Sequence, residues 1–251
     1  RLDEDGMLGA LAAVGVAFLL IVAVNRALRA AGWYQKRAEP DLKCLLDLVA
    51  LGTVCDMAPL TGLNRAFVRQ GLKVMARRGN AGLVALADLA RVNETPNAYH
   101  LGFLIGPRVN AGGRVGESGL GARLLATSDL SEAAGIARRL DEHNEQRKKL
   151  EQEVLHAART QAEVADDSSP ILVVAGESWH PGVIGIVAGR LVELFNRPSC
   201  VIALEGSEGK GSGRSVKGVD LGAAVVAARQ AGLLSAGGGH PMAAGFTVAR
   251  A

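Results

Sequence analysis

Aromatic residues are scarce in this chain: two Trp, two Tyr and five Phe supply only 4% of its 251 residues. Proteins that grip unpaired nucleic-acid bases usually stack them on aromatic rings, and so few rings exclude an extended stacking surface. Hydrophobic residues, in contrast, make up 49% of the chain, and glycine contributes 32 residues. This composition excludes a disordered chain and predicts a soluble α/β protein long enough for two domains.

Cysteine is also rare. Cys44, Cys55 and Cys200 are odd in number, and the chain has no Cys-x-x-Cys pair. These features exclude a disulfide framework. Because most of their neighbours are apolar, we expect reduced thiols in the core and a cytoplasmic protein.

Two common phosphate-binding motifs are missing. The chain has no P-loop, and Gly211-x-Gly213 has Val216 where a dinucleotide fingerprint needs its third glycine. Two other glycine-rich segments are present instead, Gly209–Ser215 and Gly237–Gly245. Glycine leaves backbone amides unshielded, and lysine, arginine and serine add side-chain donors, so both segments suit a phosphate. The alternative is a pair of glycine turns in an α/β domain. The candidate donors are Lys210, Ser212, Arg214, Ser215, Gly237, Gly238, Gly239 and His240.

Positive charge is concentrated in residues 60–115, where eight Lys and Arg face only Asp88 and Glu94, a local excess of six. This favours a polyanionic partner, although a solvated basic face has the same charge. Residues 106–116 predict a glycine loop. Its Arg108, Asn110 and Arg114 are candidates for phosphate binding, because arginine binds phosphate through two parallel hydrogen bonds. The alternative is a capping loop whose arginines pair with carboxylates.

The uncharged run Met7–Val24 is long enough to cross a bilayer core of ~30 Å. Five of its eighteen residues are Ala and two are Gly. Asp3, Glu4 and Asp5 precede it, where a signal peptide carries positive charge. We therefore expect a buried core helix that ends near Gly32, and no membrane.

Helical periodicity predicts an amphipathic helix over Asn64–Arg78. The longest helix is predicted to begin at Ser128 or Asp129 and to run to about Val164. Its middle, residues 141–149, is polar on every face, as in a helix that bridges two bodies through solvent. The domain boundary is placed there.

The segment after this helix alternates strand and helix. Ile171–Ala175 and Pro198–Leu204 predict strands on either side of a helix at Val183–Phe195, which together make a small α/β domain. His180, beside Trp179, is either a substrate contact or a turn residue, and the turn is favoured.

Asp56 is the one carboxylate in the apolar stretch Thr53–Pro59. It is either a helix cap or turn former, or a ligand for a hard cation such as Mg²⁺ or Mn²⁺. Spacing alone favours the cap.

Five motifs, taken in order, resemble the RecJ family of single-strand-specific DNA exonucleases in the DHH phosphoesterase superfamily. They are Thr53–Asp56, Gly106–Arg114, Trp179–Arg190, Gly211–Ser215 and Gly237–His240. The resemblance implies an α/β fold with three parts. These are the C-terminal helical part of a DHH domain at 1–127, a connecting helix at 128–165, and a small DHH-associated, substrate-binding domain at 166–251.

The resemblance also implies chemistry. Two Mn²⁺ or Mg²⁺ ions would activate a water and stabilise in-line displacement at phosphorus. Such enzymes degrade single-stranded DNA from the 5′ end in recombination and repair, with a repair helicase or a single-strand-binding protein as a partner. Asp56 matches a metal ligand, and Gly237–His240 match a phosphate-binding motif facing the metals. Ser212 and Arg214 match a pocket for the 5′ phosphate, and Arg108, Asn110 and Arg114 match a loop near the substrate.

The Asp-His-His motif itself is absent, as are the paired aspartates that precede it in the family. The chain begins where the family would just have passed this motif, so we expect truncation before Arg1. We also expect little or no activity, because one ligand cannot assemble two metals.

Two alternatives stay open. A DHH-type phosphoesterase for short oligonucleotides or cyclic dinucleotides shares Gly-Gly-Gly-His, and a preference for long single strands would distinguish the two enzymes. A non-catalytic nucleic-acid-binding module, or a membrane-anchored protein that uses Met7–Val24, is the other. Partition into the soluble fraction without detergent would exclude the membrane version.

Overall fold

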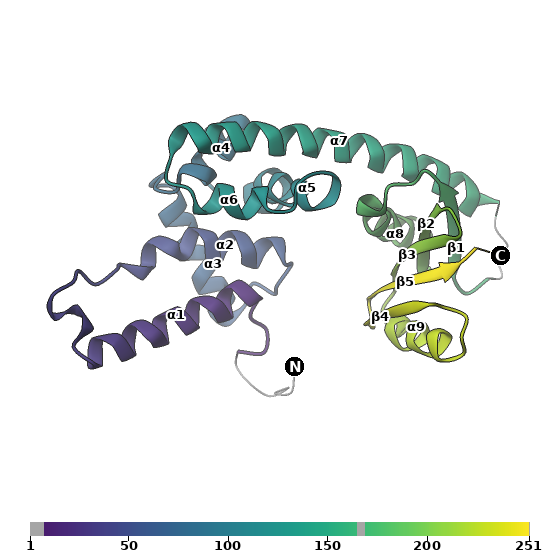
Figure 1. The fold of residues 1–251 in the computed structure, drawn as a ribbon, viewed down its shortest axis with the longest axis horizontal. Coiled ribbons are helices and arrows are strands. Elements are labelled where there is room, and N and C mark those ends of the chain that lie inside the picture. Colours follow the sequence, from purple (N-terminus) through teal and green to yellow (C-terminus); the bar gives the residue numbers. More distant parts are fainter. Residues whose placement is uncertain (1–7, 165–168, 251) are drawn as a thin grey trace. The chain divides into compact units, whose positions relative to one another are not determined.

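The computed structural model describes residues 8–164 and 169–250, which form two compact units (Figure 1). Residues 8–112 and 117–142 make a helical unit. Residues 113–116, 143–164 and 169–250 make a unit built on a β-sheet, the sheet unit. The predicted α/β class is confirmed.

Short helices build most of the helical unit. They are α1 (Ala13–Ala30), α2 (Leu46–Cys55), α3 (Gly62–Met75), α4 (Ala81–Leu89), α5 (Gly106–Val115) and α6 (Leu120–Ala126), with 3₁₀ turns at Trp33–Gln35 and Leu42–Leu45 and a π-helix at His100–Ile105. Their core is aliphatic, with Leu86, Leu101 and Leu124 fully buried. Helices α2 and α3 pack closely because residue 71 is glycine: a Cβ there would lie 2.0 Å from the carbonyl oxygen of Leu46.

Helix α1 covers the later part of the uncharged run and continues to Ala30, so it ends near Gly32, as predicted. Gly32 has φ 75°. The expectation of a buried core helix was wrong, because only 17% of its residues are buried. Phe18 packs edge-on against Phe67 of α3, whereas Leu20 and Val24 are exposed. Its length and mean hydropathy also meet the criteria for a membrane span, the one such helix among the described residues.

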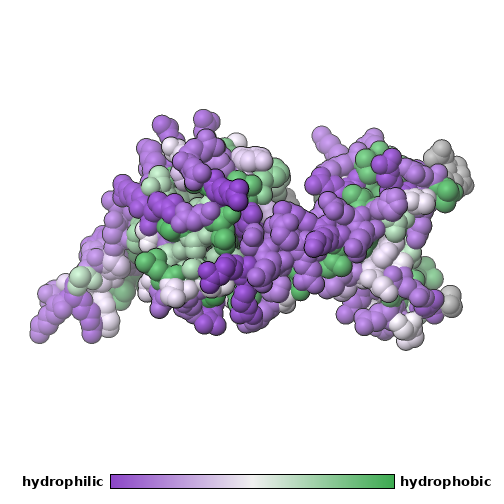
Figure 2. Space-filling view, turned by 90° about the horizontal axis from the view of Figure 1, so that it is seen from above, coloured by the Kyte–Doolittle hydropathy of each residue, from purple (hydrophilic) through white to green (hydrophobic). Residues whose placement is uncertain are grey.

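Helix α7 (Leu130–Glu163) is the longest element described, and it begins where the sequence predicted. Asp129 caps it, accepting hydrogen bonds from the amides of Ser131 and Glu132. Seen from above in Figure 2, the surface along the middle of α7 is hydrophilic. The buried face of α7 is also polar there, because the polar residue Asn144 lies on it and is only 1% exposed. The predicted helix is confirmed, but its middle is not solvated on every face.

The sheet unit holds five described strands in the order β1-β2-β3-β5-β4. They are β1 (Leu172–Glu177), β2 (Ser199–Glu205), β3 (Glu208–Arg214), β4 (Ala236–His240) and β5 (Ala243–Ala249), with helices α8 (Pro181–Phe195) and α9 (Leu221–Gln230). Strands β1 and β2 are parallel and joined by α8, and the remaining pairs are antiparallel. The β-α-β arrangement expected from the sequence is confirmed.

The three cysteines differ in exposure. Cys200 is buried in β2 and Cys55 is partly buried, and burial raises the pKa of each thiol to about 11. Cys44 is exposed, so the prediction of a core thiol was wrong there.

Candidate functional site

Four of the predicted phosphate-binding side chains lie on one face of the sheet. Directly paired residues on neighbouring strands point to the same side, and residues along a strand alternate. The register pairs Ser212 with Gly245 and Gly245 with Gly238. Flanking rows run Lys210–Thr247–Ala236 and Arg214–Ala243–His240 across the same three strands. The face therefore presents Lys210, Ser212, Arg214 and His240 above a floor of small residues, and α8 packs at this side.

The glycines of β3 lie in a paired strand, and not in a segment whose amides are open to an anion. Strand β3 is paired on both sides, with β2 and β5, so its amides belong to the sheet and not to an open anion loop. Gly211 and Gly213 face the side covered by α9. A Cβ at 211 would lie 2.2 Å from the ring of Phe246, and one at 213 would lie 2.6 Å from Leu221. Both glycines are required by packing.

The glycines of the Gly-Gly-Gly-His motif also face alternate sides of the sheet. A Cβ on Gly237 would lie 2.8 Å from Val225 of α9, and one on Gly239 would lie 2.4 Å from the carbonyl oxygen of Ala243. Gly238, in contrast, has open space where a side chain would be. Gly237 and Gly239 therefore serve packing, and Gly238 leaves the opposite face bare.

The two motifs share one cavity. A hollow of about 470 Å³ is lined by residues of β3, β4, β5 and the start of α8. We call it the sheet hollow. Its lining residues include Pro181, Ile184, Lys210, Ser212, Gly238 and Gly245. Since bare backbone forms its floor and side-chain donors stand at its edge, a tetrahedral anion can approach closely.

Ser212 and Arg214 form a connected pair of donors. The Arg214 guanidinium donates to the Ser212 hydroxyl at 3.2 Å, and also to the Gly213 carbonyl oxygen. A Cβ on Gly185 of α8 would lie 2.9 Å from the Ser212 hydroxyl and 3.1 Å from the Arg214 guanidinium. Gly185 therefore leaves room for both side chains, a role that the sequence did not reveal.

Three arginines gather in the sheet unit. Burial, together with the positive charges of Arg147 and Arg214, lowers the pKa of Arg114, although its side chain retains solvent access. Burial lowers the pKa of Arg214 as well. Arginine stays protonated at neutral pH, so the three side chains carry a net positive charge that an anion would stabilise.

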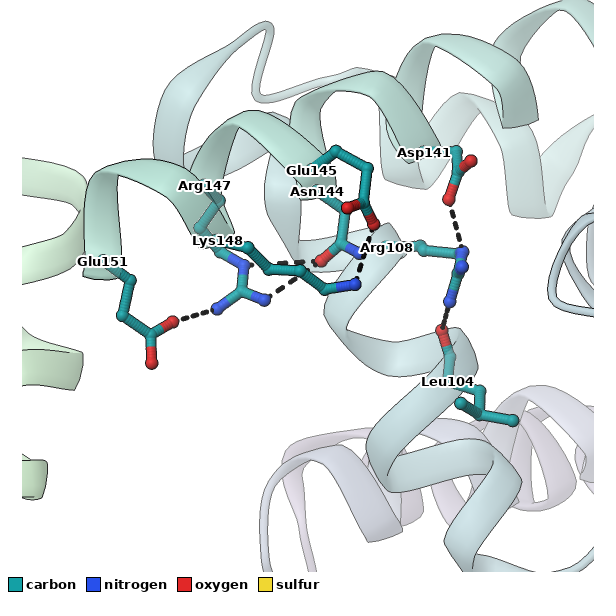
Figure 3. Close-up of polar contacts among 8 residues, drawn as sticks. All are labelled: Leu104, Arg108, Asp141, Asn144, Glu145, Arg147, Lys148 and Glu151. Carbon is teal, nitrogen blue, oxygen red and sulfur yellow. Dashed lines mark hydrogen bonds and ion pairs between the residues drawn. The ribbon is translucent and has the colours of Figure 1, made fainter. Parts of the chain in front are cut away.

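One carboxylate offsets part of this charge. Arg147 on α7 donates to Glu151 at 2.6 Å and to the Asn144 side chain, as Figure 3 shows. The side chains of Arg147 and Glu151 are 13% and 15% exposed. This ion pair holds the Arg147 side chain on the buried face of α7.

The first turn of α8 is tied to Arg114. Its guanidinium donates to the Gly182 carbonyl oxygen at 3.3 Å, and a Cβ on Gly182 would lie 2.0 Å from the Arg114 carbonyl oxygen. His180 caps α8, accepting from the Gly182 amide at 3.0 Å. The favoured interpretation of His180 as a turn residue is confirmed.

Residues 106–116 are not a glycine loop, and that prediction was wrong. They form α5, which follows the π-helix directly. Arg108 pairs with Asp141 at 2.8 Å and donates to the Leu104 carbonyl oxygen, as Figure 3 shows. Its charge is therefore compensated within the helical unit, as the capping alternative expected. Asn110 is exposed on the same helix.

Two further predicted residues lie outside the sheet hollow. Ser215 is 4% exposed, and its hydroxyl donates to the Val219 carbonyl oxygen at 2.8 Å, so it stabilises the turn after β3. Asp56 is the exposed C-cap residue of α2. Within residues 8–164 and 169–250, no group of three or more His, Cys, Asp or Glu could hold a metal ion. Asp56 alone does not make a metal centre.

Comparison with known proteins places these motifs in a family. Residues 168–251 match the DHHA1 domain. The chain is 41% identical over 252 residues to the single-stranded-DNA-specific exonuclease RecJ of Dickeya dadantii, covering 95% of this chain and 43% of that protein. It thus spans less than half the length of that relative.

Solved structures agree. The RecJ of Thermus thermophilus, crystallised with Mg²⁺, superposes with a TM-score of 0.74 and 38% identity, covering 86% of this chain and 33% of that one. A structure of the same Thermus protein with Mn²⁺ has the same score and identity, covering 86% of this chain and 32% of that one. The chain is therefore similar to a segment of RecJ over most of its own length, and its residues 168–251 match the DHHA1 domain.

Proposed function

We propose that this chain is part of a 5′-to-3′ exonuclease specific for single-stranded DNA, acting in recombination and repair, and that its sheet unit binds the 5′ phosphate. One observation carries the second half of this proposal. Lys210, Ser212 and Gly238 line the same hollow, and Arg214 lies in the adjoining row of the same sheet face. Homology to proteins named as single-stranded-DNA-specific exonucleases supports the first half.

The binding chemistry follows from the donors. Arg214 and Ser212 offer a charged and a neutral donor side by side, and Lys210 adds a second charge two residues along the strand. Charge-assisted hydrogen bonds to phosphate are about twice as strong as neutral ones. Burial and, after it, the positive charges of Arg147 and Arg214 lower the pKa of Arg114, so a bound anion would stabilise these arginines. A terminal phosphate carries more charge than a bridging one, so the hollow favours the 5′ end.

The proposed enzyme uses metal ions, whereas the role proposed for the described residues of this chain is phosphate binding. When bound, two divalent cations would polarise phosphate and activate water. The Thermus structures contain Mg²⁺ or Mn²⁺. Asp56 is the candidate ligand in this chain, and it has too few partners among the described residues to hold an ion. The described residues therefore contribute phosphate binding, and we expect this chain alone to be inactive.

The proposal also covers the domains, the cellular location and the partners of the protein. The domain limits are residues 1–127, 128–165 and 166–251, with the last binding the substrate. A cytoplasmic location, and a repair helicase or single-strand-binding protein as partner, follow from the proposed role in repair. The alternative is a phosphoesterase acting on short oligonucleotides, because Gly238 and His240 would serve either substrate.

Fluorescence anisotropy with labelled oligonucleotides tests the proposal without requiring catalysis. We expect a 5′-phosphorylated single strand to bind more tightly than its 5′-hydroxyl counterpart and than a blunt duplex. Arg214→Ala should remove about 1–3 kcal/mol of binding free energy and abolish the preference for the phosphate.

Arg159→Ala is the matched control, since it removes the same charge from an exposed arginine that pairs with Glu163 on α7. It should leave the preference intact. Equal binding of all three ligands, unchanged by Arg214→Ala, would contradict the proposal.

A further inference from the structure

A second cavity of the sheet unit lies beyond the carboxyl ends of its two parallel strands. It has a volume of about 850 Å³, and Glu177 at the end of β1 and Glu205 at the end of β2 both line it. In α/β sheets, ligands bind outside the carboxyl ends of parallel strands. We call this space the Trp179 cavity, because Trp179 is the aromatic residue of its lining.

Trp179 is held firmly in place. A Cβ on Gly176 would lie 2.2 Å from the indole, so the ring occupies the space of a missing side chain. The remainder of the ring is partly exposed and lines the cavity. The preceding residue, Ser178, has φ 61°, a left-handed conformation that costs free energy for a residue other than glycine. Such backbone strain clusters at ligand sites.

The charges of the cavity exclude a phosphate as its main occupant. Glu177, Glu205 and Glu208 line it, against the cations Lys210 and Arg250. Arg250 is already paired with Glu177 at 2.7 Å. A flat, uncharged ring with hydrogen-bonding edges suits these surroundings, because it can stack on the indole while the carboxylates accept hydrogen bonds from its amino groups.

The Trp179 cavity adjoins the sheet hollow. Pro181 and Lys210 line both spaces. Lys210 and Ser212 point to the same side of β3, so a DNA strand that leaves the sheet hollow along this row passes Lys210, which also lines the Trp179 cavity. We propose that the Trp179 cavity is a nucleobase subsite, in which a base near the 5′ end of the bound strand stacks on Trp179. This inference rests on the proposed function.

Two measurements test the subsite in the full chain. The first compares binding of a 5′-phosphorylated oligonucleotide with that of the same strand carrying abasic nucleotides at its 5′ end. We expect the abasic strand to bind about tenfold more weakly, the value of one stacked base. Trp179→Leu should bind both strands equally, and Trp179→Phe, which keeps a ring, should restore most of the difference.

The second measurement uses fluorescence. The chain has two tryptophans, so Trp33→Phe leaves Trp179 as the sole emitter. Trp33 lies in the helical unit, where Arg37 sits over its ring at 3.9 Å, and its replacement should not change binding. The normal strand should quench Trp179 emission, and the abasic strand should quench it much less.

The outcomes separate this inference from the proposed function. The preference for a 5′ phosphate reports on the sheet hollow and should survive in Trp179→Leu. If that preference is present but the abasic and normal strands bind and quench equally, the nucleobase subsite is wrong and the phosphate site stands. If wild-type protein shows no preference for the phosphate, the proposed function itself fails.

Discussion

At the scale of single residues, the candidate site depends on where side chains are missing. Ser212 and Arg214 have room because residue 185 is glycine, and the floor beside them is bare because Gly245 and Gly238 continue the row of Ser212. The sequence singled out Lys210, Ser212 and Arg214, and the structure places all three on strand β3. The sequence could not assign the glycines, because a glycine at every second position looks the same in an open loop and in a packed strand.

Gly185→Ala tests this arrangement. The new Cβ would lie 2.9 Å from the Ser212 hydroxyl, and both Ser212 and Arg214 are side chains that can shift aside. We expect binding of a 5′-phosphorylated strand to weaken by roughly tenfold with little loss of stability, because charged hydrogen bonds are displaced while the core is untouched.

Gly189→Ala is the matched control on the same helix, since nothing lies within 4 Å of its added Cβ. It should stabilise α8 by about 0.5–1 kcal/mol and leave DNA binding unchanged. Equal binding by wild type and Gly185→Ala would show that Gly185 does not shape the site.

Cys200 predicts a dependence of stability on pH. Burial raises the pKa of its thiol from 9.0 to about 11, so the folded state holds the proton more tightly than the unfolded state. The stabilisation is therefore complete below pH 9.0 and is lost as pH rises through about 11. Relative to Cys200→Ala, wild-type protein should lose roughly 2 kcal/mol of unfolding free energy over that window. Urea unfolding at several pH values measures it, and parallel curves for the two proteins would refute the account.

At the scale of elements, the sequence predicted helix α7 and the β-α-β segment made by β1, α8 and β2. The β-α-β order follows from apolar runs around Val183–Phe195, and the start of α7 follows from its cap at Asp129. Helix α5 was missed because Pro107 and Gly112 usually interrupt helices. In the structure, Pro107 lies in the first turn, where proline is tolerated. Gly112 lets the Glu117 carbonyl oxygen come within 2.7 Å of the position of a Cβ.

Strand β3 offers a test of packing. Gly211→Ala would place a methyl group 2.2 Å from the ring of Phe246, between strands that pair on both sides. We expect a loss of about 1–3 kcal/mol in unfolding free energy, measured by urea denaturation, because overpacking forces the ring and the backbone apart. Gly238→Ala has open space for its methyl group and should leave stability within about 0.5 kcal/mol of wild type. Similar losses for both variants would contradict the division of the sheet into a packed and a bare face.

Helix α7 offers a test of the buried ion pair. Glu151→Ala leaves Arg147 without its carboxylate in a stripe where both side chains are mostly buried, so we expect a loss of roughly 2–4 kcal/mol. Replacing both residues, Arg147→Met with Glu151→Leu, should recover most of that loss, because no charge stays buried. Thermal or urea unfolding compares them, and a double variant no more stable than Glu151→Ala would argue against this role for the pair.

At the scale of the whole molecule, the proposed function assigns phosphate binding to the described residues and does not assign catalysis to them. The described residues contain a site rich in arginine and glycine but no cluster that could hold a metal ion. We therefore expect EDTA to leave binding of a 5′-phosphorylated strand unchanged, and Mn²⁺ or Mg²⁺ to produce no release of nucleotides by this chain. Degradation of the strand that depends on metal and is blocked by EDTA would contradict this expectation.

A crystal structure of the chain with a short 5′-phosphorylated oligonucleotide tests the central claim most directly. The account predicts density for the terminal phosphate in the sheet hollow, within hydrogen-bonding distance of Ser212 and Arg214 and above Gly238. A well-ordered oligonucleotide whose 5′ phosphate lies elsewhere, with the sheet hollow empty, would contradict it.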